Sequence, residues 1–305
     1  MSHLASKNEN TNEGGIWTAI ITPFDQRGEI DWPAYEKILQ QQADAKVTGV
    51  VVSGTTGESP TLTVQEKLSL IKKAVAVLGG KIRIMAGTGS NNTQQSVELS
   101  KLAVDAGADS LLIVNPYYNK PCLAGLKKHY EVIKTAAKVP LCLYYIPSRT
   151  GLTLPVAQLA DLVNSLEIDM VKESSGDIVY FSELLSLTNC TMLTGDDPML
   201  IPTLALGGRG AISAVANVFP SEFVELYELF TNGRHQEAAS LNKNLIKIMR
   251  TAFIESNPGP IKAMLKLRGT CDDFMRLPMM SVTEQSLIKI REDLKTTDSA
   301  LSSKK

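Results

Sequence analysis

A lysine lies inside one of the most apolar segments of this 305-residue chain. Lys172 follows the run IDMV at 168–171, which is typical of a buried strand. Burial of an ammonium group is costly, and removal from water favours the neutral amine, which attacks carbonyl carbons. Two interpretations stay open from the residues alone. Lys172 is a nucleophile, or it lies at the strand end, where it reaches solvent or pairs with Glu173.

Other polar side chains stand where further apolar runs end. Segment 53–58 (SGTTGE) has glycines that allow close backbone approach and two adjacent hydroxyls, Thr55 and Thr56, that can bind a carboxylate. In segment 143–151 (LYYIPSRTG), strand alternation sends Tyr144 and Tyr145 to opposite faces, and Arg149 suits a carboxylate. A capped turn or a plain surface arginine is the structural alternative.

Two aromatic residues, Tyr117 and Tyr118, lie between prolines in the segment NPYYNKP at 115–121. Such a rigid loop is typical of a contact with a ligand or another subunit. Two glycine-rich segments, 87–90 and 207–210, have the composition of phosphate loops. The first lacks a following Lys-Ser/Thr and the second precedes a strand, so we interpret both as structural turns.

The elements that must position these residues alternate along the chain. Short apolar runs are followed by polar loops and then by amphipathic helical stretches, which is typical of parallel strands covered on both faces. Eight such units predict an α/β fold, a (β/α)8 TIM barrel, in preference to a doubly wound sheet. The eight runs lie at 16–24, 49–54, 82–87, 110–116, 141–147, 168–174, 191–195 and 211–216.

After the eighth run the pattern becomes helical, at 220–254, 258–268 and 283–295. We therefore expect a barrel over 15–231 and a C-terminal helical region over 232–297. Residues 1–14 are expected to form a disordered N-terminal tail and residues 298–305 a flexible tail. The first residues lack an apolar signal region, and no apolar run reaches the ~18 residues of a membrane span, so a cytoplasmic protein without a membrane partner is expected.

Composition narrows the function classes. With 31 Lys+Arg against 32 Asp+Glu, the net charge is -1, which argues against nucleic acid as a partner. Three scattered histidines and four isolated cysteines do not supply metal-ligand pairs. We expect reduced thiols, no metal and no cofactor.

Taken together, the motifs resemble those of the dihydrodipicolinate synthase / N-acetylneuraminate lyase family of Schiff-base-forming barrels. The resemblance runs from about residue 15 to about residue 295, with five motifs in order at the ends of the expected strands. They are GTTGE at 54–58, PYYNKP at 116–121, YYIPSRTG at 144–151, VKE at 171–173 and GAIS at 210–213.

The resemblance implies a class I aldol condensation of pyruvate with aspartate 4-semialdehyde, in lysine and diaminopimelate biosynthesis. It implies that Lys172 forms an imine with pyruvate and that Tyr144 moves protons. Thr55 and Tyr118 would complete a hydroxyl relay, with Tyr118 supplied by a neighbouring subunit. The implied assembly is a homotetramer, a dimer of dimers.

The resemblance also implies the substrate contacts. Thr56 would hold the pyruvate carboxylate and Arg149 the semialdehyde carboxylate, while Gly195 and Ile212 would form walls of the site. Tyr145 stands where the family has an asparagine, at a position expected to face away from the lysine.

Two other functions compete with this one. Another pyruvate aldolase of the family, such as a sialic acid lyase, would share Lys172 and Tyr144, but sialic acid lyases usually have Ser-Thr at 55–56 and lack Arg149. A non-catalytic barrel that serves as a binding protein would have no reason to keep Thr55, Tyr118, Tyr144 and Lys172 together.

The family's lysine-binding regulatory site is only partly present. Ser59, Asn91 and Tyr117 match it, whereas Val64 and Lys67 replace two histidines and Gln95 replaces a glutamate. The carboxylate partner for the lysine amino group is therefore missing, and Lys67 adds a repelling charge.

We predict that L-lysine inhibits this protein weakly or not at all. Millimolar lysine is expected to leave the initial rate nearly unchanged in a steady-state assay. Inhibition at micromolar lysine would contradict this prediction.

Overall fold

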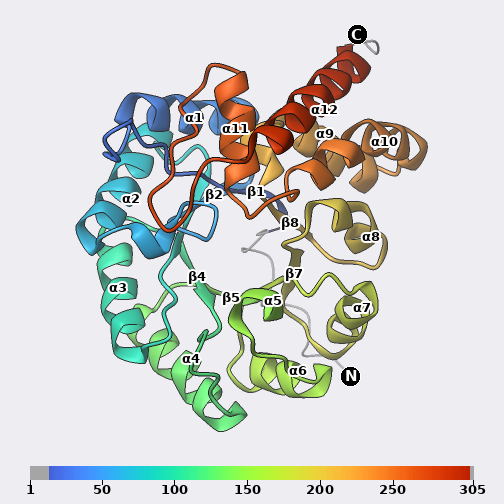
Figure 1. The fold of residues 1–305 in the computed structure, drawn as a ribbon. Helices are drawn as coiled ribbons and strands as arrows, with labels where there is room; N and C mark the ends of the chain where they lie inside the picture. The colour runs from blue at the N-terminus through green and yellow to red at the C-terminus, as the bar shows by residue number, and fades with distance from the viewer. Residues whose placement is uncertain (1–13, 303–305) are drawn as a thin grey trace.

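Eight parallel strands pair in chain order and close into a barrel, because β8 pairs with β1 as well as with β7. The computed structural model describes residues 14–302, and the predicted TIM barrel is confirmed (Figure 1). The strands are β1 (Gly15–Ala19), β2 (Gly49–Val52), β3 (Arg83–Gly87), β4 (Ser110–Val114), β5 (Leu141–Tyr145), β6 (Met170–Glu173), β7 (Thr191–Thr194) and β8 (Gly210–Ser213).

Helices surround the strands as an outer ring (Figure 1). Local signals fix their ends: α2 begins at a capping box formed by Thr63 and Glu66 and ends at Gly79, which has a left-handed conformation. The ring consists of α1 (Trp32–Asp44), α2 (Val64–Leu78), α3 (Thr93–Asp105), α4 (Leu123–Ala137), α5 (Pro147–Thr150), α6 (Val156–Ser165), α7 (Ile178–Leu187), α8 (Leu200–Ala205) and α9 (Pro220–Thr231).

The first strand is shorter than the apolar run at 16–24. The reason is Asn217, whose side-chain oxygen accepts from the Ile21 backbone N–H and whose amide donates to the Ala19 carbonyl. A side chain therefore takes over the backbone groups that a longer β1 would offer to a neighbouring strand.

Alternation along the strands separates two apolar layers. One layer fills the space between the strands and the helices, and the other fills the barrel lumen. The buried lumen residues are Trp17, Ala19, Val51, Met85, Leu112, Cys142, Tyr144, Ile146, Met170, Leu193 and Ile212.

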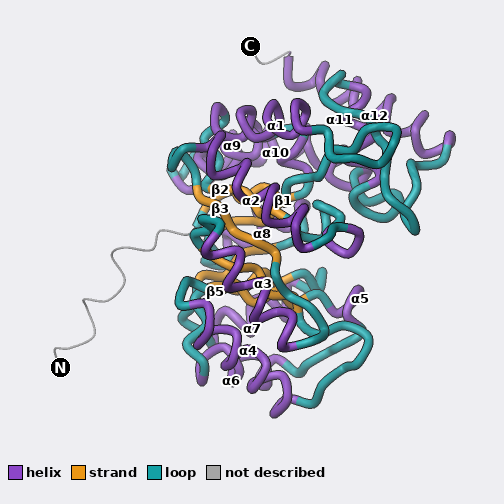
Figure 2. The backbone as a smooth tube through the Cα atoms, turned by 90° about the vertical axis from the view of Figure 1, so that its left-hand side faces the viewer, coloured by secondary structure: helices purple, strands orange, loops and turns teal. Residues whose placement is uncertain are grey.

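The predicted C-terminal helical extension is confirmed as α10 (His235–Thr251), α11 (Gly259–Leu267) and α12 (Glu284–Ser302). Helix α10 packs on α9 and α12, and α11 packs on α12. Seen from the side, α5, α11 and α12 extend toward the same end of the strands (Figure 2). The extension therefore reaches the end of the barrel where active sites of this fold lie.

The predicted flexible tail at 298–305 is wrong for residues 298–302, which belong to α12. Thr297 is buried just before them, and Asp298 forms an ion pair with Arg268 at 2.6 Å, so tertiary contacts hold this turn in place. Residues 303–305 and the predicted N-terminal tail, except Gly14, lie outside the described residues. Gly14 is buried, and its carbonyl accepts from the Thr48 hydroxyl.

Within residues 14–302, every helix is too short or too polar to cross a membrane.

Arg276, on the segment between α11 and α12, joins the extension to the barrel. Its guanidinium donates to both carboxylate oxygens of Glu66 in the first turn of α2. These hydrogen bonds lower the pKa of Glu66 to about 2. The carboxylate also accepts from the Thr63 backbone N–H at 2.8 Å, so one side chain caps α2 and anchors the extension.

We predict that Glu66→Gln lowers the free energy of unfolding by about 2 kcal/mol at neutral pH, because a charge-assisted pair and part of a cap are lost. The folded pKa of Glu66 lies below its unfolded value, so this stability is present above pH 4.5 and is lost as the pH falls toward 2. Urea unfolding of both proteins at several pH values measures the difference.

Glu131→Gln is the matched control, because the exposed Lys128–Glu131 pair contributes little. A Glu66→Gln protein whose deficit stays constant from neutral pH to pH 2 would contradict the assignment of that stability to the ionised carboxylate.

Candidate active site

The register of the barrel places one residue from each of the strands β4 to β7 side by side, near the carboxyl ends of the strands. Val114 pairs with Tyr144, Tyr144 with Lys172, and Lys172 with Leu193. Tyr144 and Leu193 face the lumen, and so does Met170, two residues before Lys172. Alternation therefore directs the Lys172 side chain into the lumen beside Tyr144.

Lys172 is 5% exposed, which contradicts the interpretation that it reaches solvent. Its ammonium lies over the Tyr144 ring, 4.2 Å from the ring centroid. The negative face of an aromatic ring is a weak partner for a buried cation compared with a carboxylate. Lys172 is thus removed from water, and within residues 14–302 no carboxylate forms an ion pair with it.

Gly195 follows β7 and provides the space that the lysine occupies. A Cβ atom at this position would lie 2.6 Å from Lys172 Cε and 1.9 Å from Ser174 Oγ. A larger residue would therefore displace the lysine. Ile212 of β8, the other predicted wall residue, is buried in the lumen layer.

Glu173 does not pair with Lys172 in the described part of the chain. It is directed away from the lumen, and its carboxylate accepts from the Ser175 backbone N–H at 2.7 Å. Burial raises the pKa of Glu173 to about 7. Burial also raises the pKa of Asp196, and the Lys172 charge opposes part of that rise.

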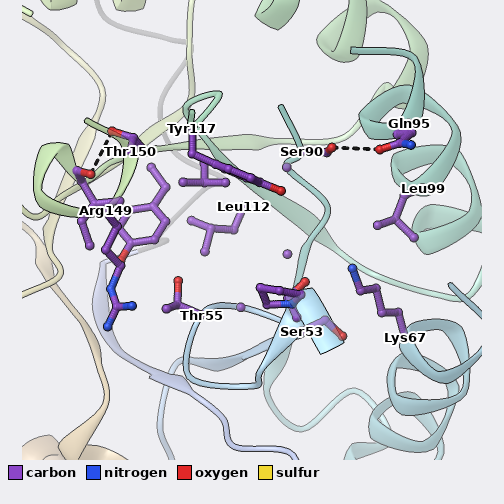
Figure 3. Close-up of a pocket in the computed structure, with 18 of the residues that line it drawn as sticks. Ser53, Thr55, Lys67, Ser90, Gln95, Leu99, Leu112, Tyr117, Arg149 and Thr150 are labelled. Atoms are coloured by element: carbon purple, nitrogen blue, oxygen red, sulfur yellow. Dashed lines mark hydrogen bonds between the residues drawn. The ribbon is translucent and has the colours of Figure 1, made fainter. Parts of the chain in front are cut away.

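A cavity of about 700 Å³ opens above this level and extends between α2, α3 and the loops that follow the strands (Figure 3). Thr55, Tyr144 and Arg149 line it, and so do Ser59 and Tyr117. Arg149 and Lys67 lie at opposite ends of the cavity in this view. Lys67 is partly buried in this cavity wall, and the loss of water around its ammonium lowers its pKa.

Thr56 is buried in the loop after β2, and its hydroxyl oxygen accepts from Asn257 Nδ2 at 2.8 Å. The Asn257 carbonyl in turn lies 3.5 Å from Arg149 Nη2. Asn257 was not singled out from the sequence, because the segment SNPGP at 256–260 has only the composition of a turn and follows no strand.

Tyr118 is 89% exposed and does not line this chain's own cavity. Its backbone has a positive φ of 72°, which is uncommon for a residue with a side chain. Asn91 anchors the loop, since its amide donates to the Tyr117 carbonyl while its own carbonyl accepts from Asn119. The structure thus brings Ser59 and Tyr117 to the cavity, whereas Asn91 supports the loop beside it.

Tyr145 faces the helices, as alternation predicts. Its ring stacks on Tyr180 of α7 with centroids 5.3 Å apart, and its hydroxyl accepts from the Leu154 backbone N–H. It is therefore a packing residue outside the lumen.

A closed parallel barrel with a cavity at the carboxyl ends of its strands is the arrangement of a TIM-barrel enzyme. Comparison with known proteins narrows the class further. Residues 12–297 match the model of the dihydrodipicolinate synthetase family. The chain belongs to this family, and it is a lyase.

Relatives found by sequence align with this chain over nearly their whole length. A 4-hydroxy-tetrahydrodipicolinate synthase from Leptospira biflexa is 42% identical over 272 residues, which cover 88% of this chain and 92% of the relative. A protein of the same name from Methanococcus aeolicus is 39% identical over 282 residues, which cover 92% of this chain and 98% of the relative.

Solved structures show the same fold. The 4-hydroxy-tetrahydrodipicolinate synthase from Methylacidiphilum fumariolicum SolV superposes with a TM-score of 0.92 at 36% identity, over 95% of this chain and 97% of that one. A structure described as a monomeric dihydrodipicolinate synthase variant superposes with a TM-score of 0.91 at 34% identity, over 93% of this chain and 97% of that one.

Proposed function

We propose that this enzyme condenses pyruvate with aspartate 4-semialdehyde to give 4-hydroxy-tetrahydrodipicolinate, by way of a Schiff base on Lys172. The observation that carries the proposal is the Lys172 amine, which is buried in the lumen against the ring of Tyr144, a residue that lines the cavity. The names of the relatives support the choice of substrates.

The chemistry begins with attack of the Lys172 amine on the ketone carbon of pyruvate. Loss of water gives an imine, and its protonated form withdraws electrons from the methyl group, which then loses a proton. The resulting enamine carbon attacks the aldehyde carbon of the semialdehyde, whose oxygen takes up a proton. The amino group of the semialdehyde then closes the ring on the imine carbon and frees Lys172.

Tyr144 is the residue placed to move these protons, because it pairs in register with Lys172 and its ring contacts the ammonium. Thr55 lines the same cavity and can pass a proton between Tyr144 and a further hydroxyl. Thr56 is assigned to the pyruvate carboxylate, and Arg149, at the cavity mouth, to the carboxylate of the semialdehyde.

Tyr118 is assigned to the site of a neighbouring subunit. Its side chain is exposed, on a loop tied down by Asn91, and the cavity rim beside it carries the exposed apolar side chains of Val64, Leu102 and Tyr117. Such a rim is a surface for another protein chain. We propose a dimer with shared sites and a homotetramer built from two such dimers, working in the cytoplasm without a metal or cofactor.

Borohydride reduction in the presence of pyruvate tests the Schiff base. Mass spectrometry of the digested protein is expected to find the reduced pyruvate adduct on Lys172, and Lys172→Ala is expected to abolish it. Lys262→Ala is a poor control because that lysine is a buried structural residue, so Lys37→Ala, on the outer face of α1, serves as the matched variant. Absence of any adduct would leave a binding protein as the remaining interpretation.

The second substrate is tested with a coupled assay that follows the condensation product. Turnover is expected with aspartate 4-semialdehyde and not with N-acetylmannosamine, the acceptor of the rival sialic acid lyase. An adduct on Lys172 without turnover of the semialdehyde would keep the Schiff base and reject the proposed substrate.

We predict that Tyr118→Phe lowers kcat by roughly a hundredfold, the usual scale for a lost proton-transfer group, and weakens the dimer. Tyr227→Phe on α9, far from the loop in sequence, is the matched control and is expected to keep full activity. Steady-state kinetics and sedimentation velocity measure the two effects.

Mixing variants separates a shared site from a site within one subunit. When Tyr118→Phe and Lys172→Ala proteins exchange subunits, each mixed dimer is expected to gain one site with both native residues, so activity returns. Failure to recover activity after demonstrated exchange would show that Tyr118 does not act across the interface.

A further inference from the structure

The C-terminal extension touches the loop that follows β2 through a buried hydrogen bond. Asn257 lies just before α11, yet its side-chain N–H donates to the hydroxyl oxygen of Thr56, 201 positions earlier in the chain. Both residues are less than a tenth exposed. A polar contact between buried side chains of such distant segments is strongly specified by its geometry, because either partner alone would be left unsatisfied.

The direction of this hydrogen bond matters for an anionic ligand. Since the Thr56 oxygen accepts from Asn257, the hydroxyl proton of Thr56 is left free to point elsewhere. The hydroxyl therefore keeps a proton that it can donate to the carboxylate of a ligand, and its oxygen is already held in place. The Asn257 carbonyl also faces Arg149 at 3.5 Å, so one residue contacts both groups that the proposed function assigns to substrate carboxylates.

A second set of contacts joins α11, which begins two residues after Asn257, to the loop that follows β2. Lys262, one turn into α11, forms a fully buried ion pair with Glu58 at the end of the loop after β2. Its ammonium also donates to the Phe274 carbonyl at 2.8 Å and lies over the Phe24 ring. The Arg276 backbone N–H donates to the other oxygen of Glu58 at 3.2 Å.

These contacts make the loop after β2 and the start of α11 one rigid unit. A buried pair with satisfied neighbours tolerates little displacement, because separation would leave two charges without partners in an apolar surrounding. The distance between Asn257 and Thr56 is therefore fixed by contacts of residues that do not line the cavity.

We propose that Asn257 is a positioning residue for recognition of the pyruvate carboxylate, acting through the Thr56 hydroxyl, and that the C-terminal extension is in this way part of the substrate site. The inference rests on the proposed function, since it concerns how that reaction holds its first substrate. This role differs from a purely structural one because it predicts that the effect of Asn257 depends on whether the ligand has a carboxylate.

The test compares a ketone that has a carboxylate with one that lacks it. Asn257→Ala is expected to raise KM for pyruvate about tenfold with a smaller change in kcat, the scale of one lost hydrogen bond near a charge. KM for aspartate 4-semialdehyde is expected to change less, because the backbone contact to Arg149 remains. The rate of borohydride trapping should fall for pyruvate and stay unchanged for hydroxyacetone, which is neutral.

Two further variants address a general loss of structure. Asn257→Asp keeps the size of the side chain but places a negative charge beside Thr56, so trapping of pyruvate should fall further than in Asn257→Ala while trapping of hydroxyacetone persists. In a Thr56→Val background, Asn257→Ala should add no further loss for pyruvate, because the two residues act as one unit. Asn164→Ala, which removes one exposed side-chain hydrogen bond on α6, is the matched control.

Equal losses for pyruvate and hydroxyacetone, or full additivity with Thr56→Val, would overturn the inference and leave Asn257 as a structural residue. The wild-type reaction keeps this result separate from the proposed function. Failure of the wild-type protein to trap pyruvate would reject the Schiff base itself, whereas normal wild-type trapping with an unchanged Asn257→Ala protein would reject only the role of Asn257.

Discussion

Closure of the barrel is the constraint on which the site depends. Gly15 of β1 pairs with Gly210 of β8, and a Cβ atom on Gly210 would lie 2.0 Å from the Gly15 carbonyl oxygen. Only a residue without a side chain permits this approach. Once the seam is closed, the register of every strand is fixed, and alternation decides which side chains enter the lumen. The placement of Lys172 beside Tyr144 follows from that closure.

Two buried lysines, Lys262 and Lys172, differ in the groups that surround their amines. Lys262 is completely buried and has a carboxylate, a carbonyl and an aromatic ring as partners, so its amine is fixed in place and cannot approach a ligand. The ammonium of Lys172 instead lies over the ring of Tyr144, a residue that lines the cavity. The same residue type is therefore an anchor in one place, and in the other it is the amine to which the proposed function assigns the Schiff base.

Much of this arrangement could be predicted from the sequence because it depends on local periodicity. The eight apolar runs and the opposite faces of Tyr144 and Tyr145 follow from alternation within single strands. The sequence alone left open whether Lys172 is buried or reaches solvent, and the closed barrel decides for burial. The contact between Asn257 and Thr56 could not be predicted in this way, since it joins segments whose distance depends on the packing of α11. The end of α12 was missed for the same reason: its last turn has a polar sequence and is held by contacts with Arg268 rather than by propensity.

The two sides of the cavity differ in how they are covered. On the side of Arg149, the extension lies close, and Asn257 satisfies polar groups that a loop at the barrel rim would otherwise leave to water. On the side of Tyr117, Val64 and Leu102, the rim is apolar and exposed, and the exposed Tyr118 does not line the chain's own cavity. Apolar exposure of this kind has a free-energy cost, which burial against a second subunit would remove. Covalent chemistry on a buried amine requires a site closed to bulk water. This chain's own helices provide closure on one side, so the proposed dimer completes a wall that the fold begins.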